Sequence, residues 1–160
     1  MKIALLSDTH DHVENTLRAV EIIKEKKVDR VIHTGDLCSP FMIQAFAGFQ
    51  FDLVKGNNDA DVTRIMKNME ENQRFHDEFL YLEIEGIKMA FYHGTTKEIT
   101  QALVNDNYDI VVSGHTHTKV EERQGDTLHI NPGSVHGFSK GGSFAILTLP
   151  EKTIEFINLG

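Results

Sequence analysis

Five short polar motifs follow apolar runs along the chain, and their side chains are of the kinds that bind metal ions. In order they are Asp8-Thr9-His10, Gly35-Asp36, Gly56-Asn57-Asn58-Asp59, His93-Gly94 and Gly114-His115-Thr116-His117. The candidate ligands among them are two Asp, four His and one Asn. Two cations a few ångströms apart need about seven or eight oxygen and nitrogen ligands, with one carboxylate shared between them. The motifs therefore point to a two-metal centre of the kind that hydrolyses phosphate esters.

Alternating strands and helices are expected to carry the first three motifs. Apolar runs at residues 2–7, 30–33 and 51–54 predict buried strands, and helices are expected at residues 40–46 and 62–69. Asp11 followed by Glu14 resembles a capping box, which predicts a helix that begins there. Val13, Leu17 and Val20 recur along that helix at a spacing typical of a buried face. This alternation is typical of a largely parallel sheet covered by helices.

The second half is richer in strands. Residues 79–85 and 87–92 read as a hairpin-like pair, a helix is expected around 98–105, and a buried strand at 109–113. Further strands are expected at 119–123, 127–130, 143–149 and 153–157. The predicted fold class is α/β: a four-layer αββα sandwich of two mixed sheets flanked by helices. We expect residues 1–160 to form a single domain.

Each motif comes directly after a predicted strand. In open α/β sheets, ligands bind beyond the carboxyl ends of the strands. The Asp-x-His and His-x-His spacings bring both side chains of a motif near one point of an extended segment or loop. The flanking glycines allow tight backbone paths close to bound ions.

Composition narrows the classes of function. The 24 acidic residues outnumber the 16 basic ones, for a formal net charge of −8. This balance argues against an extended nucleic-acid footprint, which needs a basic face. The single cysteine, Cys38, makes neither an internal disulfide nor a Cys-based zinc site. No apolar run reaches the roughly 18 residues of a membrane span, so we expect no membrane association and a cytoplasmic location.

The motifs in this order resemble those of the calcineurin-like metallophosphoesterase superfamily. The motifs SDTH, GD, GNND, HG and GHTH carry the resemblance, with GNND in place of the usual GNH-D/E. The size of the chain and its Asn131-Pro132-Gly133-Ser134 segment resemble the small single-domain phosphodiesterase branch. That branch is also similar to the retromer scaffold subunit.

The resemblance implies a role for each candidate ligand. Asp8, His10 and His117 would bind one metal ion. Asn57, His93 and His115 would bind the other, and Asp36 would bridge the two. We expect two divalent transition-metal ions, Mn²⁺ first, with Ni²⁺, Fe or Zn²⁺ as alternatives, because ligand type alone does not choose between them. A hydroxide held between the ions would attack the phosphorus atom in line.

Asn58 departs from the family pattern. Many relatives carry a His there, placed to contact the phosphate and help the leaving oxygen. An amide donates a hydrogen bond but cannot act as a general acid near neutral pH. We expect Asn58 to contact the phosphate weakly, so that diesters with acidic leaving groups react best, unless His12 or His136 takes the missing role. Asp59 is expected to fix the loop or a ligand imidazole, or else to cap a helix.

These observations predict a dinuclear metal-dependent phosphodiesterase that acts on small phosphodiesters. Two alternatives stay open at this point: a phosphomonoesterase or nuclease that uses the same site, and a weakly catalytic protein-interaction scaffold. The complete ligand set argues against a scaffold, whereas the missing histidine at position 58 argues mildly for one. The expected partner is a small phosphodiester substrate, and the sequence leaves homo-oligomer formation open.

Overall fold

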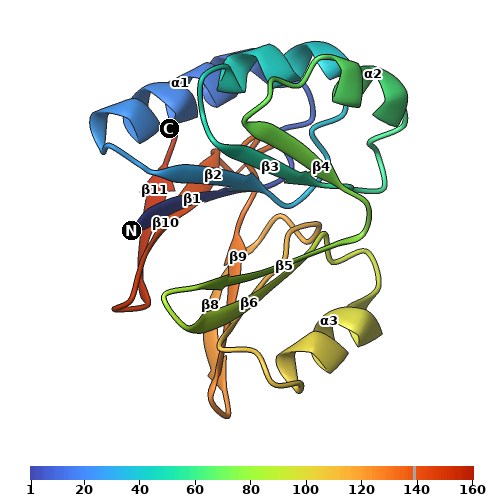
Figure 1. The fold of residues 1–160 in the computed structure, drawn as a ribbon. Helices are drawn as coiled ribbons and strands as arrows, with labels where there is room; N and C mark the ends of the chain where they lie inside the picture. The colour runs from blue at the N-terminus through green and yellow to red at the C-terminus, as the bar shows by residue number, and fades with distance from the viewer. Residues whose placement is uncertain (139) are drawn as a thin grey trace.

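Two sheets form the centre of the molecule (Figure 1). The computed structural model describes residues 1–138 and 140–160. The larger sheet has the strand order β11-β10-β1-β2-β3-β4; β1 to β4 run parallel, and β10 and β11 run antiparallel to their neighbours. Its strands are β1 (Lys2–Leu6), β2 (Arg30–His33), β3 (Phe51–Val54), β4 (Gln73–His76), β10 (Ser143–Thr148) and β11 (Thr153–Asn158).

The smaller sheet has the strand order β5-β6-β7-β9-β8. Its central strands β6, β7 and β9 are parallel, and the edge strands β5 and β8 pair antiparallel with them. The expected hairpin is therefore present as β5 and β6. The strands are β5 (Phe79–Ile84), β6 (Ile87–Tyr92), β7 (Ile110–Val112), β8 (Lys119–Gln124) and β9 (Thr127–Pro132).

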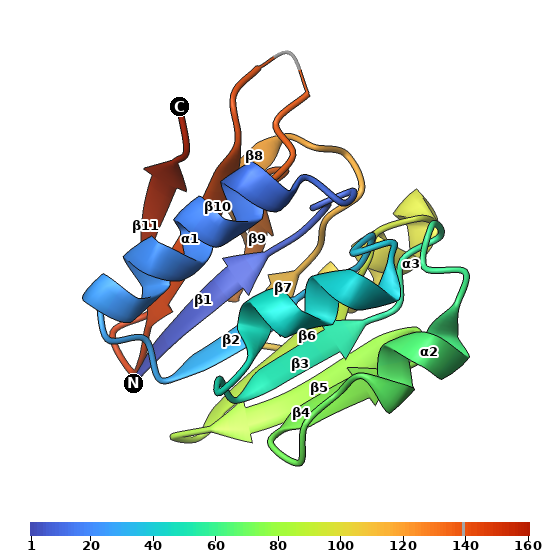
Figure 2. The same ribbon diagram turned by 90° about the horizontal axis from the view of Figure 1, so that it is seen from above.

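Helices cover the outer faces of both sheets. The α-helices α1 (Val13–Glu25) and α2 (Val62–Lys67) and the 3-10 helix η1 (Pro40–Phe46) lie on the larger sheet, whereas α3 (Lys97–Val104) lies on the smaller one (Figures 1 and 2). The predicted αββα sandwich of two mixed sheets is confirmed. Within the described residues, no helix combines the length and apolar character needed to cross a bilayer.

The alternation of side chains along each strand divides the apolar residues into separate layers. Ala4 and Leu6 of β1 face α1 and η1, where Phe46 stacks on Phe51 with ring centroids 4.5 Å apart. Ile3 and Leu5 of the same strand point the other way, into the core between the two sheets. Both faces of β1 are buried, which explains why its sequence is a continuous apolar run instead of an alternating one.

Helix α1 differs from the sequence-based expectation at its start and along its face. His12, not Asp11, is the N-cap, and its Nδ1 accepts a hydrogen bond from the Asn15 amide. Asp11 instead binds the amide and hydroxyl of Ser39. Of the three residues expected on the buried face, Val13 and Leu17 are about half exposed, whereas Val20 is buried. The buried residues are Thr16, Ala19, Val20 and Ile23.

Strand β4 was missing from the predicted elements. Its sequence QRFH has one apolar residue, and its pairing with β3 depends on contacts that no local pattern records. Asp52 on β3 joins the two strands: its side chain is buried and pairs with Arg30 Nη2 at 2.7 Å and His76 Nε2 at 2.8 Å. Burial alone would raise the pKa of Asp52, but the hydrogen bonds and charges of His76 and Arg30 outweigh it and lower that pKa.

We expect Asp52→Asn to lower the free energy of unfolding by about 3 kcal/mol at neutral pH, because it leaves Arg30 without its charged partner in a buried place. A lowered pKa in the folded state means that this stabilisation is present above the unfolded pKa of about 3.9 and is lost as the pH falls through the folded value. Urea unfolding from pH 7 to pH 3 should show that the difference in stability between the two proteins begins to shrink below about pH 4.

Glu155→Gln is the control for this measurement. It breaks the exposed ion pair between Lys26 and Glu155 on the same sheet and should cost less than about 1 kcal/mol. An equal loss of stability in the two variants, or a gap between wild type and Asp52→Asn that stays unchanged as the pH falls from 7 to 3, would contradict the assigned role of Asp52.

Candidate metal centre

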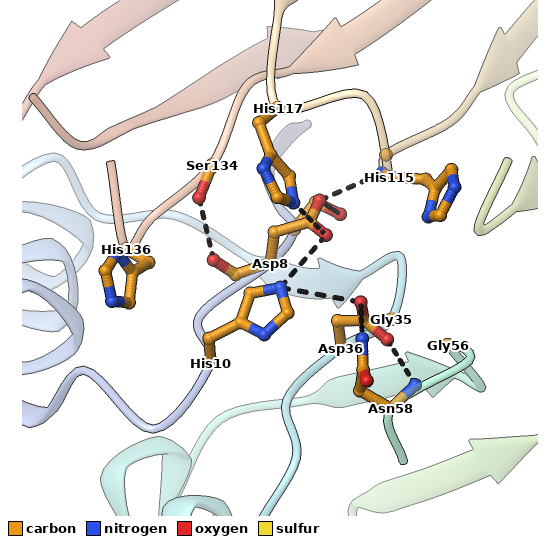
Figure 3. Close-up of polar contacts among 12 residues, drawn as sticks. Asp8, His10, Gly35, Asp36, Gly56, Asn58, His115, His117, Ser134 and His136 are labelled. Atoms are coloured by element: carbon orange, nitrogen blue, oxygen red, sulfur yellow. Dashed lines mark hydrogen bonds and ion pairs between the residues drawn. The ribbon is translucent and has the colours of Figure 1, made fainter. Parts of the chain in front are cut away.

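The seven predicted ligands lie in loops that follow strands β1, β2, β3, β6 and β7. These strands end at the same edge of the sandwich, so residues far apart in sequence meet there (Figure 3). The structure forms two groups that could hold a metal ion, and within each group the candidate ligand atoms lie within 4.8 Å of one another. They are Asp8, His10 and His117 in the first group and Asp36, His93 and His115 in the second.

The first group converges on one carboxylate oxygen. Asp8 Oδ1 lies 3.6 Å from His10 Nε2 and 3.2 Å from His117 Nε2 (Figure 3). The other oxygen of Asp8, Oδ2, accepts hydrogen bonds from the Ser7 hydroxyl at 2.5 Å and the His115 amide at 3.0 Å. One oxygen therefore fixes the carboxylate in place, and the other faces the imidazoles.

Asp36 connects the two groups. Its Oδ2 lies 3.5 Å from His10 Nε2 in the first group and 3.4 Å from His93 Nε2 in the second. Asn57 also reaches the second group, since its Oδ1 lies 3.0 Å from His93 Nε2. A carboxylate between two sets of ligands is in the place that a bridging ligand needs.

The chemistry of the donors fits bound cations. Asp8 Oδ1 and His10 Nε2 are buried side-chain atoms that have no hydrogen-bond partner among residues 1–138 and 140–160. Buried polar atoms are rarely left unpaired, and a cation would satisfy both at once. The His93 ring is also oriented as a metal ligand needs. Its Nδ1 donates to the Thr34 carbonyl at 2.7 Å, which leaves Nε2 free as a ligand. Mixed carboxylate, imidazole and amide donors suit transition-metal ions.

Five of the candidate ligands have a backbone conformation that is uncommon for residues other than glycine. The φ angles of Asp8, His10, Asp36, His115 and His117 are 55°, 41°, 58°, 66° and 57°. Such left-handed conformations cost free energy and gather at functional sites, where the surrounding structure enforces them. Here they turn side chains from separate loops toward one point.

Two glycines allow the loops to approach each other. A Cβ atom on Gly35 would lie 2.6 Å from His93 Nδ1, and one on Gly56 would overlap the amide and carboxylate of Asp36. Any side chain at either position would push apart the loops after β2, β3 and β6. The glycines that the sequence places beside the ligands are therefore a steric requirement of the site.

Opposite charges shift the pKa values across the site. Burial alone would raise the pKa of Asp36 and of Asp8, but the neighbouring imidazoles, together with hydrogen bonds from Asn58 to Asp36 and from Ser7 to Asp8, outweigh it and lower both pKa values. The adjacent carboxylate of Asp8 raises the pKa of His10. At His93, burial alone would lower the pKa, but the neighbouring Asp36 outweighs it and raises that pKa. Metal ions must therefore compete with protons for these imidazoles.

Asn58 lies at the site beside Asp36, and it is hydrogen-bonded to that carboxylate. Its backbone amide donates to Asp36 Oδ1 and its side-chain Nδ2 to Asp36 Oδ2, both at 2.8 Å (Figure 3). The predicted contact with a phosphate stays a prediction. The position does place the side chain at residue 58 next to the proposed bridging carboxylate.

Asp59 fixes the loops around Asp36. Its carboxylate is buried and accepts hydrogen bonds from the backbone amides of Asp36, Cys38 and Gly56, at 3.0, 2.7 and 2.7 Å. Of the roles considered from the sequence, loop fixation is the one that these contacts show, because the cap of helix α2 is Asp61. Burial raises the pKa of Asp59, and this effect outweighs the three amide hydrogen bonds, which by themselves would lower that pKa.

His12 and His136, considered as substitutes at position 58, lie on the side of the first group. Their rings are 5.0 Å apart, and each Nδ1 accepts a local backbone amide, from Asn15 and Phe138 respectively. Their contact with substrate stays a prediction. His33, in contrast, is fully buried, and burial lowers its pKa to about 3, so it is neutral and structural.

Two residues near the ligands were not assigned a role from the sequence. Asn131 Nδ2 donates to the Gly114 carbonyl at 2.8 Å and to Thr116 Oγ1 at 3.1 Å, which fixes the loop that carries His115 and His117. Phe138 stacks on His117 with ring centroids 4.6 Å apart. Asn131 belongs to the NPGS segment, which was noted as a family feature without a function, and no local pattern marks Phe138.

Comparison with known proteins agrees with this site. Residues 1–152 match the family model of the calcineurin-like phosphoesterase superfamily domain. The phosphodiesterase MJ0936 of Methanocaldococcus jannaschii is 36% identical over 147 residues, which are 88% of each chain. A solved structure described as a novel archaeal phosphodiesterase superposes with a TM-score of 0.92 and 33% identity over 99% of both chains.

A more distant structural relative is wild-type Vps29 of Entamoeba histolytica in complex with Zn²⁺. It superposes with a TM-score of 0.67 over 100% of both chains, at 19% identity, and this likeness shows the fold alone. The family match and the archaeal relative go further, because they cover most of the chain with substantial identity. On this evidence the chain belongs to the calcineurin-like phosphoesterase superfamily.

Proposed function

We propose that this chain is a dinuclear metal-dependent phosphodiesterase and that residues 1–160 form one catalytic domain. The observation that carries the proposal is the position of Asp36 between two ligand groups, with Asp8 Oδ1 and His10 Nε2 buried and unpaired beside it. The name of the archaeal relative, a phosphodiesterase, supports the same reaction.

In this proposal Asp8, His10 and His117 hold one ion, and Asn57, His93 and His115 hold the other. Asp36 contributes to both sites. When bound, the two cations would activate a water nucleophile and neutralise negative charge on the phosphoryl oxygens. The chain's own contribution is to fix the ligands in place: Ser7 and the His115 amide orient Asp8, and Thr34 orients the His93 ring.

Small diesters are the substrates that this chain suits best. Its formal charge of −8 disfavours a long polyanionic substrate, whereas a single phosphate can be bound by the metal ions themselves. Mn²⁺ is the ion that we propose first. The identity of the metal ion and the cytoplasmic location of the protein stay predictions.

A protein-interaction role on the same fold is the second candidate. The structural likeness to Vps29 and a cleft of about 260 Å³ lined by Val13, Leu17 and Phe41, each about half exposed, favour it. Metal-dependent hydrolysis of bis(4-nitrophenyl) phosphate distinguishes the two candidates. Turnover that disappears with a chelator and returns with Mn²⁺ supports the enzyme, and no turnover with Mn²⁺, Ni²⁺, Fe²⁺ or Zn²⁺ supports the scaffold.

We expect protein reconstituted with Mn²⁺ to bind two ions per chain, and His117→Ala to keep the ion of the other group. Because the pKa values of His10 and His93 are raised, protons should already displace the metal before the pH has fallen to the ordinary imidazole pKa of about 6.5. Isothermal titration calorimetry and elemental analysis test both points. A stoichiometry of one ion or fewer in wild type would exclude the dinuclear site.

Asp36→Asn should reduce kcat/KM by at least about 10³-fold, because it removes the only negative charge shared by the two ligand groups. Asp52→Asn is the matched control, since Asp52 is also buried and paired with a histidine but lies away from the ligand groups. Its kcat/KM should stay within about twofold of wild type at a temperature where both variants are folded. Similar losses in the two variants would mean that the centre is assigned wrongly.

Asn58→His should restore a protonatable group next to Asp36. Wild type should show a steep negative slope of log kcat/KM against leaving-group pKa, and the variant a flatter one. The gain for poor leaving groups has an upper limit of about 10²–10⁴-fold, because general acid catalysis helps most where the leaving oxygen needs a proton. Asn58→Gln, which keeps an amide, is the control. Equal slopes in all three proteins would show that residue 58 does not serve the leaving group.

A further inference from the structure

A cleft of about 380 Å³ lies between α3 and the outer face of the smaller sheet. This volume falls in the range of roughly 300–1,000 Å³ that is common for clefts that bind small organic molecules. One wall is a face of α3, formed by Lys97, Gln101 and Val104, which are spaced as neighbours on a helix. Figure 1 shows this helix on the outer side of the sheet.

Strands β8 and β9 form the other wall of the cleft, and their pleat decides which side chains face it. Val120, Glu122 and Gln124 alternate along β8, so their side chains point to the same face of the sheet, and all three line the cleft. Asn131 and His129 lie opposite Val120 and Glu122 in the strand register and complete this wall. The alternation identifies Glu121, which is exposed and does not line the cleft, as a residue of the opposite face.

The cleft borders the candidate metal centre. His115, a member of the second ligand group, is also one of its lining residues. The segment Gly94–Thr95 follows the candidate ligand His93, and the segment Gly114–Thr116 contains the candidate ligand His115. Both segments line the cleft. A phosphodiester bound at the second group can therefore direct one of its two ester groups into this space.

Polar side chains occupy places where a sheet under a helix usually buries apolar ones. The apolar cluster beneath α3 has only three buried members, Ala90, Val104 and Val111. Toward the metal centre it is replaced by Ser113, which is 3% exposed and whose Oγ lies 2.9 Å from His129 Nε2. Neither residue belongs to the candidate ligand groups, and their side-chain hydrogen-bond contact is to each other.

Most of the side chains that line the cleft carry a polar group, and their formal charges nearly balance. Lys97 and Glu122 are its one cationic and one carboxylate side chain apart from the histidines, and hydroxyl and amide groups make up most of the remainder. Gln101 and Gln124 are hydrogen-bonded to each other at 3.1 Å across the two walls. Such a surface offers both donors and acceptors and favours an uncharged group over an ionic one.

We propose that this cleft is a substrate subsite that takes an uncharged, hydrogen-bonding ester group of about nucleoside size. The proposal rests on the proposed phosphodiesterase function and names the class of diester that the enzyme prefers. His115 marks the boundary between the reacting phosphate and the subsite. The residues of the cleft set specificity and do not take part in the hydrolysis itself.

Two diesters with the same leaving group test the subsite. Thymidine 5′-(4-nitrophenyl phosphate) carries a nucleoside as its retained ester, and methyl 4-nitrophenyl phosphate carries a methyl group. With the Mn²⁺-loaded enzyme, KM should be at least about tenfold lower for the thymidine ester. Val120→Trp, which fills the cleft, should raise that KM about tenfold and leave kcat/KM for the methyl ester within about twofold.

Glu121→Trp is the matched control, because it adds the same side chain to the adjacent residue on the opposite face of β8. It should behave as wild type with both esters. Equal KM values for the two esters in wild type, or equal effects of the two tryptophans, would overturn the subsite. Thermal unfolding of both variants shows whether a loss comes from misfolding, and a misfolded Val120→Trp is replaced by Gln101→Trp from the α3 wall.

A binding measurement separates the subsite from the proposed function. Thymidine without a phosphate should bind the metal-free protein, and Val120→Trp should abolish that binding in a calorimetric titration. If neither ester is hydrolysed, the phosphodiesterase proposal fails, and thymidine binding still decides whether the cleft is a ligand site. Absence of thymidine binding together with equal KM values contradicts the subsite while leaving the phosphodiesterase intact.

Discussion

The charge of two carboxylates, Asp8 and Asp36, is the constraint on which the site depends. Both are nearly fully buried, and an isolated buried carboxylate is very costly. In the structure, imidazoles at 3.2–3.6 Å compensate them in part, which raises the pKa of His10 and of His93. Two atoms nevertheless keep no partner, so the protein groups alone do not satisfy the site. Bound cations are the partners that would complete it.

The surrounding fold holds this arrangement in place although the arrangement itself costs free energy. Left-handed backbone at five candidate ligands and the close approach of Gly56 to Asp36 are tolerated because rigid strands hold both ends of each loop. Asp59 joins the loops after β2 and β3 through three backbone amides, and Asn131 fixes the loop after β7 to the end of β9. The loops are therefore parts of the sheet framework rather than mobile connections.

In the proposed enzyme, the metal ligands and the residues that would set specificity lie in different parts of the chain. The ligands come from the parallel strands at the centre of both sheets, whose positions the two cores determine. The cleft under α3 is formed by an edge strand and by the helix that follows His93, next to the smallest apolar cluster. Residues there can change with little effect on the cores. This separation allows one metal centre to serve different diesters, since substrate contacts lie outside the ligand set.

The sequence by itself determined the alternation of strands and helices apart from β4, the two-sheet fold class and the seven residues that meet at the site. These follow from local properties: side-chain period along strands, and ligand residue types placed where strands end. It did not determine the face that α1 buries, the partner of Asp11, strand β4 or the cleft under α3. Each depends on contacts between distant residues, as between Asp8 and His115, which are 107 positions apart and hydrogen-bonded. Only the tertiary structure decides them, because a local pattern records what a residue can bury or donate and not which group it meets.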